Sequence, residues 1–214
     1  MKLLLASQNR GKIAEMEAIF KALTPSQQSQ YTFLRDLQVC SAFDLDIRIN
    51  VKESGQTYAE NAALKASAFY QASQILTLAD DSGLEVTALD GAPGLYSARY
   101  SPKENASDAD RRDYLLQQLS TKPRPWQARF HCTIAIADLK GQLHYAEGNC
   151  SGEIIPEERG THGFGYDPVF LLLELGQTMA ELSMVEKNTR SHRARAILAA
   201  LPLLEKIYLQ NKDY

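Results

Sequence analysis

The order of apolar and amphipathic segments restricts the folds open to this chain. The runs KLLLA (residues 2–6) and ILTLA (75–79) have the length and composition of buried strands, and residues 13–23 and 57–75 have helical spacing. Residues 128–155 instead contain two strand-like runs in direct succession. Strands that alternate with helices favour parallel pairing, whereas strands in succession favour a meander. The pattern therefore predicts a mixed α/β domain, organised as two lobes with a cleft between them.

The length and composition are those of one globular domain spanning residues 1–214. A net charge of −3, with no block of five or more Lys or Arg residues, argues against a nucleic-acid polymer as partner and leaves room for a small anionic ligand. Cys40, Cys132 and Cys150 lack metal-binding spacing and are expected to be reduced thiols. No signal-peptide core or membrane-length apolar run is found, so we expect a cytoplasmic protein with no membrane partner.

Local signals predict several shorter elements. Thr57 and Thr178 are each followed three residues later by Glu, which is the capping-box pattern that begins a helix. Residues 44–51 (DLDIRINV) alternate apolar and polar side chains, as a half-buried strand does. Residues 24–33 (TPSQQSQYTF) are expected to form a polar connecting loop.

The run LADDSGLEV (residues 78–86) places two adjacent carboxylates and a Ser-Gly pair directly after an apolar segment. One interpretation is a hairpin turn, because Asp, Ser and Gly form turns and both flanks are strand-like. The other is a metal or acid/base site at the end of a strand. Strand side chains alternate between faces, so Asp80 and Asp81 could enter one cleft only if the chain bends there. The sequence leaves both interpretations open.

Two further groups of residues offer chemistry for a phosphate ligand. The segment SQNRGK (residues 7–12) joins a strand to a helix, and free N–H groups at a helix start together with Lys12 attract anions. The upstream glycine of a Walker A loop is missing, and an ordinary connecting loop is the alternative. Thr57, Asn61 and Lys65 share one helix face at spacings of four residues, which a solvated polar stripe would also show.

Two groups in the second half of the chain complete the set. In GFGYDP (residues 163–168), two glycines around an aromatic residue allow the backbone to approach a ligand closely, although a structural turn is the alternative. Lys187, His192 and Arg193 lie around a helix start, where cations oppose the helix dipole. A nearby anion or polar base edge would compensate them. Together, these groups have the chemistry needed to bind a metal-bridged nucleotide polyphosphate.

Five segments give the chain a resemblance to a known family. SQNRGK, ESGQTYAENAALKA, LADDSGLEVTALDGAPGLYSARY, GFGYDPVF and EKNTRSHRARA stand in the order found in the inosine triphosphate pyrophosphatase family, and the resemblance covers nearly the whole chain. It implies an elongated two-lobed α/β domain with a central mixed β-sheet flanked by helices, an active-site cleft between the lobes, and usually a homodimer. It also implies hydrolysis of ITP, dITP and XTP to the nucleoside monophosphate and pyrophosphate with Mg²⁺. The chain departs slightly from the family's usual pattern at Ser7, Gln8 and His162, and its 24–33 segment is longer than usual. These departures bear on how the substrate is positioned.

The resemblance also implies roles for individual residues. Glu53 and Asp81 would hold magnesium, Asp81 would act as the base, and Ser82 would touch the substrate. The phosphates would be held by Ser7, Gln8, Asn9, Arg10, Gly11, Lys12, Lys65 and Lys187. The base pocket would be formed by Phe164, Gly165, Tyr166, Asp167, His192 and Arg193. A nucleotide-binding regulatory module without turnover and a pyrimidine or dUTP pyrophosphatase are the alternatives.

Overall fold

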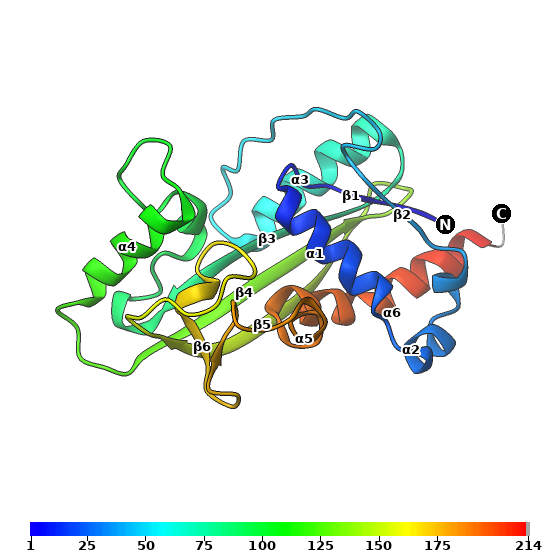
Figure 1. Cartoon of the computed structure of the whole chain (residues 1–214). Coiled ribbons are helices and arrows are strands. Elements are labelled where there is room, and N and C mark those ends of the chain that lie inside the picture. The colour runs from blue at the N-terminus through cyan, green and yellow to red at the C-terminus, as the bar shows by residue number, and fades with distance from the viewer. Residues whose placement is uncertain (213–214) are drawn as a thin grey trace. The chain divides into compact units, whose positions relative to one another are not determined.

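The computed structural model describes residues 1–212 (Figure 1). Within this part of the chain, seven strands form one sheet in the order β2-β1-β3-β4-β5-β6-β7. β1 pairs in parallel with β2 and β3, while β6 pairs antiparallel with β5 and β7. The sheet is therefore mixed, which confirms the predicted α/β class. The strands are β1 (Lys2–Leu5), β2 (Gln38–Ser41), β3 (Leu76–Val86), β4 (Trp126–Ala137), β5 (Leu143–Ile154), β6 (Phe170–Leu172) and β7 (Gln177–Thr178).

Side-chain caps begin most of the α-helices. Thr57 caps α3 by accepting a hydrogen bond from the Glu60 N–H, as its sequence pattern predicts, and Ser107 caps α4 through a reciprocal box with Asp110. Such caps satisfy backbone donors that a helix start leaves without partners. The α-helices are α1 (Arg10–Lys21), α2 (Pro25–Gln30), α3 (Tyr58–Ser73), α4 (Asp108–Leu119), α5 (Met184–Arg190) and α6 (His192–Lys212). None of the helices in the described part of the chain combines the length and apolarity needed to span a membrane.

The chain divides into two compact units, which we call unit 1 and unit 2. Unit 1 comprises Met1–Asp81, Cys132–Gly148 and the described residues from Arg193 onward. Unit 2 comprises Ser82–His131 and Asn149–His192. The prediction that residues 1–214 form a single domain stays a prediction.

Alternate strand residues of unit 1 pack against different helices. Leu76 and Leu78 of β3 belong to one apolar cluster with side chains of α1 and α6. Leu4 of β1 and Ala79 of β3 belong to another cluster, formed with side chains of α3. Fully burying a leucine side chain is worth about 1.5–3 kcal/mol, so the register of these strands is strongly specified. That register decides which helix each later residue of β3 faces.

The core of unit 2 is built around large side chains. Leu115 and Leu119 of α4 are fully buried in a cluster with Trp126, Phe130 and Phe170. Phe130 and Phe170 have ring centroids 4.4 Å apart, a separation at which aromatic pairs attract. This cluster fixes α4 within unit 2, and the residues at the start of α4 contact residues 156–168, which we call the glycine loop.

Two local predictions are wrong because a side chain bonds the backbone differently from the expected pattern. Residues 44–51 form no strand, since the Asp44 carboxylate accepts hydrogen bonds from the Ser41 N–H and hydroxyl and Asp46 has a φ of 50°. Thr178 lies in β7 and not at a helix start. The Glu181 carboxylate does accept from the Thr178 N–H, but the helix begins later, with Ser183 as the cap of α5.

The prediction that residues 24–33 form a connecting loop is also wrong. The segment contains α2 and the first two residues of the 3₁₀-helix Thr32–Arg35. Thr24 caps α2 in a reciprocal box with Gln27, and Pro25 occupies the first turn, where its missing N–H is not needed. The sequence carried this signal, since Thr-Pro-x-Gln is a capping pattern with proline at the favoured position.

Candidate active site

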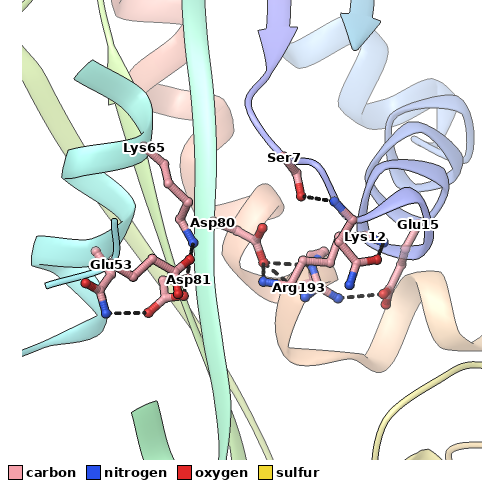
Figure 2. Close-up of polar contacts among 10 residues, drawn as sticks. Ser7, Lys12, Glu15, Glu53, Lys65, Asp80, Asp81 and Arg193 are labelled. Atoms are coloured by element: carbon pink, nitrogen blue, oxygen red, sulfur yellow. Dashed lines mark hydrogen bonds and ion pairs between the residues drawn. The ribbon is translucent and has the colours of Figure 1, made fainter. Parts of the chain in front are cut away.

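The run LADDSGLEV lies inside one continuous strand. β3 extends from Leu76 to Val86, so the hairpin interpretation is wrong. The alternation of the strand sends Asp80 to the face covered by α1 and α6, following Leu78, and Asp81 to the face covered by α3. Figure 2 shows the two carboxylates on opposite sides of the strand, each beside a different lysine.

Asp80 lies in a buried cluster of four charged side chains. Its Oδ2 accepts hydrogen bonds from Arg193 Nε (3.1 Å) and Nη2 (3.0 Å) and lies 3.1 Å from Lys12 Nζ. Arg193 Nη1 donates to Glu15 Oε2 at 2.5 Å (Figure 2). Burial raises the pKa of Asp80, but Lys12 and Arg193 outweigh burial and hold that pKa well below its ordinary value. Asp80 is therefore a permanent anion that joins α1 and α6 to β3.

Asp81 belongs to a different cluster on the other face of β3. Lys65 Nζ donates to Glu53 Oε1 at 2.8 Å and to Asp81 Oδ1 at 3.1 Å, while Asn61 Nδ2 donates to Asp81 Oδ2 at 3.3 Å. Burial raises the pKa of Asp81, and Lys65 offsets only part of that rise. Burial alone would lower the pKa of Lys65, but its carboxylate neighbours reverse the effect and raise it. Lys65 thus stays charged, and Asp81 binds a proton more readily than an ordinary aspartate.

Local packing holds Glu53 close to α3. The Gly55 N–H donates to Asn61 Oδ1 at 2.8 Å, which ties the preceding loop to the helix. A Cβ at Gly55 would lie 2.6 Å from Glu60 Cβ, so only glycine allows this approach. Asn61 is 1% exposed, so the face of α3 that carries it is not the solvated stripe that the sequence also allowed. The structure brings Glu53, Lys65 and Asp81 together through this contact.

The loop between β1 and α1 is ordered by its own side chains. Ser7 Oγ accepts from the Asn9 N–H, and Asn9 Oδ1 accepts from the Lys12 N–H and so caps α1. Gln8 Nε2 donates to the Ile49 carbonyl, and the Arg10 guanidinium lies 4.6 Å from the Phe43 ring centroid.

The predicted phosphate residues of this loop differ in exposure. Gln8, Asn9, Arg10 and Gly11 are exposed, whereas Ser7 is buried. Their roles toward phosphate stay predictions.

In unit 2, the glycine loop is organised by Asp167. Its Oδ2 accepts from the Phe164 N–H (2.9 Å) and from Lys187 Nζ (2.7 Å), and the same Nζ lies 5.0 Å from the Phe164 ring centroid. Gly163 has a φ of +79°, and a Cβ there would lie 2.0 Å from Asp167 Oδ2. Tyr166 donates from its hydroxyl to the Ser97 carbonyl at 2.9 Å. Lys187, predicted as a phosphate ligand, is thus held among residues predicted to form the base pocket.

The remaining predicted residues fall into two groups. His192 stacks on Phe130 with ring centroids 4.7 Å apart, and Ser82 is half-buried in β3. Arg193 is 1% exposed and bonded to two carboxylates, so this geometry does not favour its predicted contact with the base.

Glu15, which is 2% exposed, also belongs to the buried cluster around Asp80, and the sequence analysis did not identify it. Its spacing was a usable signal, because Glu15 shares a helix face with the apolar Ile19 four residues later.

Glu53 and Asp81 are the residues best suited to a metal ion. Among the described residues, no group of three or more His, Cys, Asp or Glu side chains could hold one. Magnesium, however, is commonly held by one or two carboxylates together with substrate phosphates and water. Glu53 and Asp81 already share one cationic nitrogen, that of Lys65, so their oxygens fit a small hard cation.

Comparisons with known proteins identify the family of the chain. The model of the Ham1 family matches residues 3–203. A dITP/XTP pyrophosphatase of Desulforamulus reducens is 42% identical over 99% of this chain and 100% of its own length. One of Geobacter sulfurreducens is 44% identical over 92% of each chain. The solved structure of the Staphylococcus aureus Ham1 protein superposes with a TM-score of 0.79, at 38% identity over 96% of this chain and 99% of that chain. The resemblance inferred from the sequence is confirmed.

Proposed function

The chain belongs to the Ham1 family, and from this premise we propose that it hydrolyses dITP, ITP and XTP to the nucleoside monophosphate and pyrophosphate. Such a reaction would remove non-canonical purine nucleotides from the nucleotide pool. One observation carries the proposal: Asp81 has a raised pKa and shares Lys65 with a second carboxylate, Glu53. A proton acceptor, a hard-cation site and a phosphate-binding ammonium group are thereby within contact of one another.

Magnesium is the metal that this donor set fits, with Glu53 and Asp81 as its protein ligands. When bound, it would supply charge neutralisation on the phosphate oxygens. Lys65 holds both carboxylates beside one point, because its nitrogen contacts both. Asn61 fixes the second oxygen of Asp81 and so limits rotation of that carboxylate.

Asp81 accepts the proton in the proposed reaction. Water attacks the α-phosphorus, the bond from that phosphorus to the oxygen bridging to the β-phosphate breaks, and pyrophosphate leaves. The attacking water loses one proton to Asp81, whose raised pKa makes it a better acceptor than an exposed aspartate. Asp80 cannot take this role, since its pKa is lowered and its Oδ2 is held by Arg193 and Lys12.

Lys12 and Lys65 of unit 1 are proposed to stabilise negative charge on the triphosphate. Lys12 is fixed by Asp80 and Lys65 by Asp81 and Glu53, so neither ammonium group needs to be reorganised during the reaction. We assign the purine base to Phe164–Asp167 of unit 2. Lys187 is suited to the same base pocket, because Asp167 holds it above the Phe164 ring.

Arg193 receives a different role from the one its sequence position implied. We propose that it supports the site by holding Asp80 and Glu15, and that it does not bond the 6-oxo group of the base. The discrimination between 6-oxo and 6-amino purines then depends on the glycine loop and on Lys187 and His192.

The deciding experiment is steady-state release of pyrophosphate from dITP, XTP, GTP, ATP and dUTP, with and without magnesium. We expect turnover of dITP and XTP that needs magnesium and exceeds that of GTP and ATP. Binding of dITP without turnover would instead indicate a regulatory module, and preference for dUTP would indicate a pyrimidine enzyme. The implied homodimer is tested by light scattering of the purified protein, and the implied cytoplasmic location by cell fractionation.

A further inference from the structure

Gly165 is held through both of its backbone polar groups by α4. Its N–H donates to Asp108 Oδ2 at 2.8 Å, and its carbonyl accepts from Arg112 Nη1 at 2.9 Å. Asp108 and Arg112 are four residues apart on α4, so they lie on the same face of the helix. All three residues belong to unit 2. None of the chemistry assigned above uses these two charged side chains.

Arg112 is itself fixed by a second contact within the same loop. Its Nε and Nη2 donate to the two carboxylate oxygens of Glu158 at 2.7 and 2.9 Å, which is the bidentate geometry of a strong Arg–carboxylate pair. This pair directs the remaining nitrogen, Nη1, at the Gly165 carbonyl. The guanidinium thus joins Glu158 and Gly165, two points seven residues apart in the loop. Its side chain is only 12% exposed, which limits competition from water.

Asp108 is also held in place, by the start of α4 and by its own hydrogen bonds. It is the first residue of α4, and the capping box between Ser107 and Asp110 fixes the start of that helix. Burial raises the pKa of Asp108, but the Gly165 N–H and the Arg111 guanidinium outweigh burial and lower it overall. The carboxylate is therefore ionised at neutral pH and accepts from Gly165 as a charged group.

The conformation of Gly165 explains why the loop needs these contacts. Its φ is +63°, in the left-handed region, and a Cβ there would meet no atom within 4 Å. Glycine is therefore required at this position by the backbone conformation and not by lack of space. Glycine also loses more conformational freedom on ordering than any other residue, so a fixed peptide here depends on outside contacts. Asp167 holds the neighbouring Phe164 N–H from within the loop, whereas Asp108 and Arg112 hold Gly165 from α4.

We propose that Asp108 and Arg112 are positioning residues for the purine base, acting through Gly165 and the adjoining Phe164. This inference rests on the proposed function, because that function assigns the base to Phe164–Asp167. Releasing Gly165 would let the loop and the Phe164 ring shift while the catalytic carboxylates and lysines of unit 1 keep their contacts. Substrate binding and base selectivity should then change, whereas the rate of the chemical step should not.

The test compares Arg112→Ala with Arg124→Ala, a matched control. Arg124 pairs with Glu153 at 3.0 Å in the same unit and does not contact the glycine loop. For Arg112→Ala we expect the KM for dITP to rise about tenfold and kcat to stay within about threefold, since small misplacements weaken productive binding. The ratio of kcat/KM for dITP to that for dGTP should fall severalfold. The Arg124→Ala variant should match the wild type in all three quantities.

A second pair of variants separates positioning from general loss of structure. Asp108→Asn keeps an oxygen that can accept from the Gly165 N–H and should retain the wild-type selectivity, whereas Asp108→Ala should reproduce the effect of Arg112→Ala. If Arg112→Ala does not fold, Arg112→Lys replaces it, because a single ammonium group cannot serve Glu158 and Gly165 with the same geometry.

Unchanged KM and selectivity in Arg112→Ala and Asp108→Ala would overturn the proposal. So would a lower Tm accompanied by an equal loss of kcat on every substrate, which indicates a purely structural role. Failure of the proposed function is a separate result, since it would be seen in the wild type as absence of pyrophosphate release from dITP and XTP.

Discussion

Asp80 and Asp81 are neighbours in sequence with opposite electrostatic surroundings. Asp80 is 1% exposed and contacts two cations, which lower its pKa despite complete burial. Asp81 is 7% exposed and shares its one lysine with Glu53, so burial prevails and its pKa is raised. A one-residue step along a strand changes which helix a side chain faces, and here it separates a carboxylate paired with two cations from the carboxylate proposed as the base.

The difference shows that burial alone does not identify a reactive group. Asp80 is the more buried carboxylate, yet its compensation by Lys12 and Arg193 makes it a poor proton acceptor. Asp81 is incompletely compensated, which is the condition in which a carboxylate can take up a proton during turnover. The following substitutions test this contrast.

The largest expected effect is on catalysis at Asp81. Asp81→Asn is nearly isosteric but removes the proposed base and a negative metal ligand, so kcat should fall by about 10²–10⁴-fold while the fold is kept. Pyrophosphate release at saturating magnesium measures the loss, and circular dichroism checks the fold. Asp46→Asn in the same unit, whose side chain is 82% exposed, is the matched control and should be fully active. Near-wild-type turnover of Asp81→Asn would show that the base lies elsewhere.

The next effect is on stability at Asp80. Asp80→Asn leaves the buried Arg193 guanidinium short of a charged partner, and breaking such a buried pair lowers the free energy of unfolding by about 3–5 kcal/mol. Urea unfolding measures this loss. Glu17→Gln, in a 3.8 Å pair with the exposed Lys21 in the same unit, should change stability by less than about 0.5 kcal/mol.

Arg193→Ala sharpens the same contrast. It should destabilise the protein as Asp80→Asn does and lower kcat/KM for ITP and ATP in equal proportion. A selective loss of ITP activity in Arg193→Ala would restore the base-contact role that its sequence position implied.

The lysines should have intermediate effects on activity. Lys12→Met and Lys65→Met should each lower turnover by about 10²-fold, at the lower end of the range found when one electrostatic donor is removed. The losses for ITP and GTP should be similar for Lys12 and Lys65, which we assign to the triphosphate. A tenfold change in the ITP/GTP ratio for either would contradict that assignment. Such a change is the expected result for Lys187, because it lies over Phe164.

Lys65→Met also has a pH signature. Lys65 lowers the pKa of Asp81, so its removal raises that pKa and keeps the base protonated to higher pH. The acid limb of the kcat/KM profile should therefore move to higher pH. The limb should not move in Lys187→Met, because Lys187 belongs to unit 2 and pairs with Asp167.

The smallest effect is on the stability of Asp81→Asn. Because the folded-state pKa of Asp81 is raised above its unfolded value, the charged form opposes folding at pH values above that folded pKa. Asn removes this penalty, so the variant should be more stable than the wild type at neutral pH by no more than about 1 kcal/mol. This difference in stability should close as the pH falls through the folded pKa of Asp81.

The ionised form of Asp80 instead stabilises the fold, because its folded-state pKa lies below its unfolded value. This stabilisation is lost as the pH falls below the unfolded pKa, about 3.9. Urea unfolding across the acidic range distinguishes the two.

Contacts between residues close in sequence could be predicted, and contacts between distant segments could not. The Thr57 cap of α3 was predicted because its partner, Glu60, is three residues away. The interpretation of LADDSGLEV as a turn was wrong because turn-forming residues can also continue a strand when both neighbours in the sheet supply hydrogen bonds. The strand predicted at 44–51 is an exception among the local contacts, since the Asp44 carboxylate bonds Ser41, three residues away, and this contact outweighed the alternating pattern.

The sequence by itself determined the α/β class and the family, because these depend on local periodicity and on recognisable motifs, and it predicted the carboxylates and lysines of the candidate site. Only the tertiary structure decided which carboxylate met which cation. Arg193 reaches Asp80 across 113 residues of chain and Glu15 across 178, and no local signal encodes such pairings. They arise because the register of β3 sends adjacent side chains to opposite faces, where different helices supply the compensating charge.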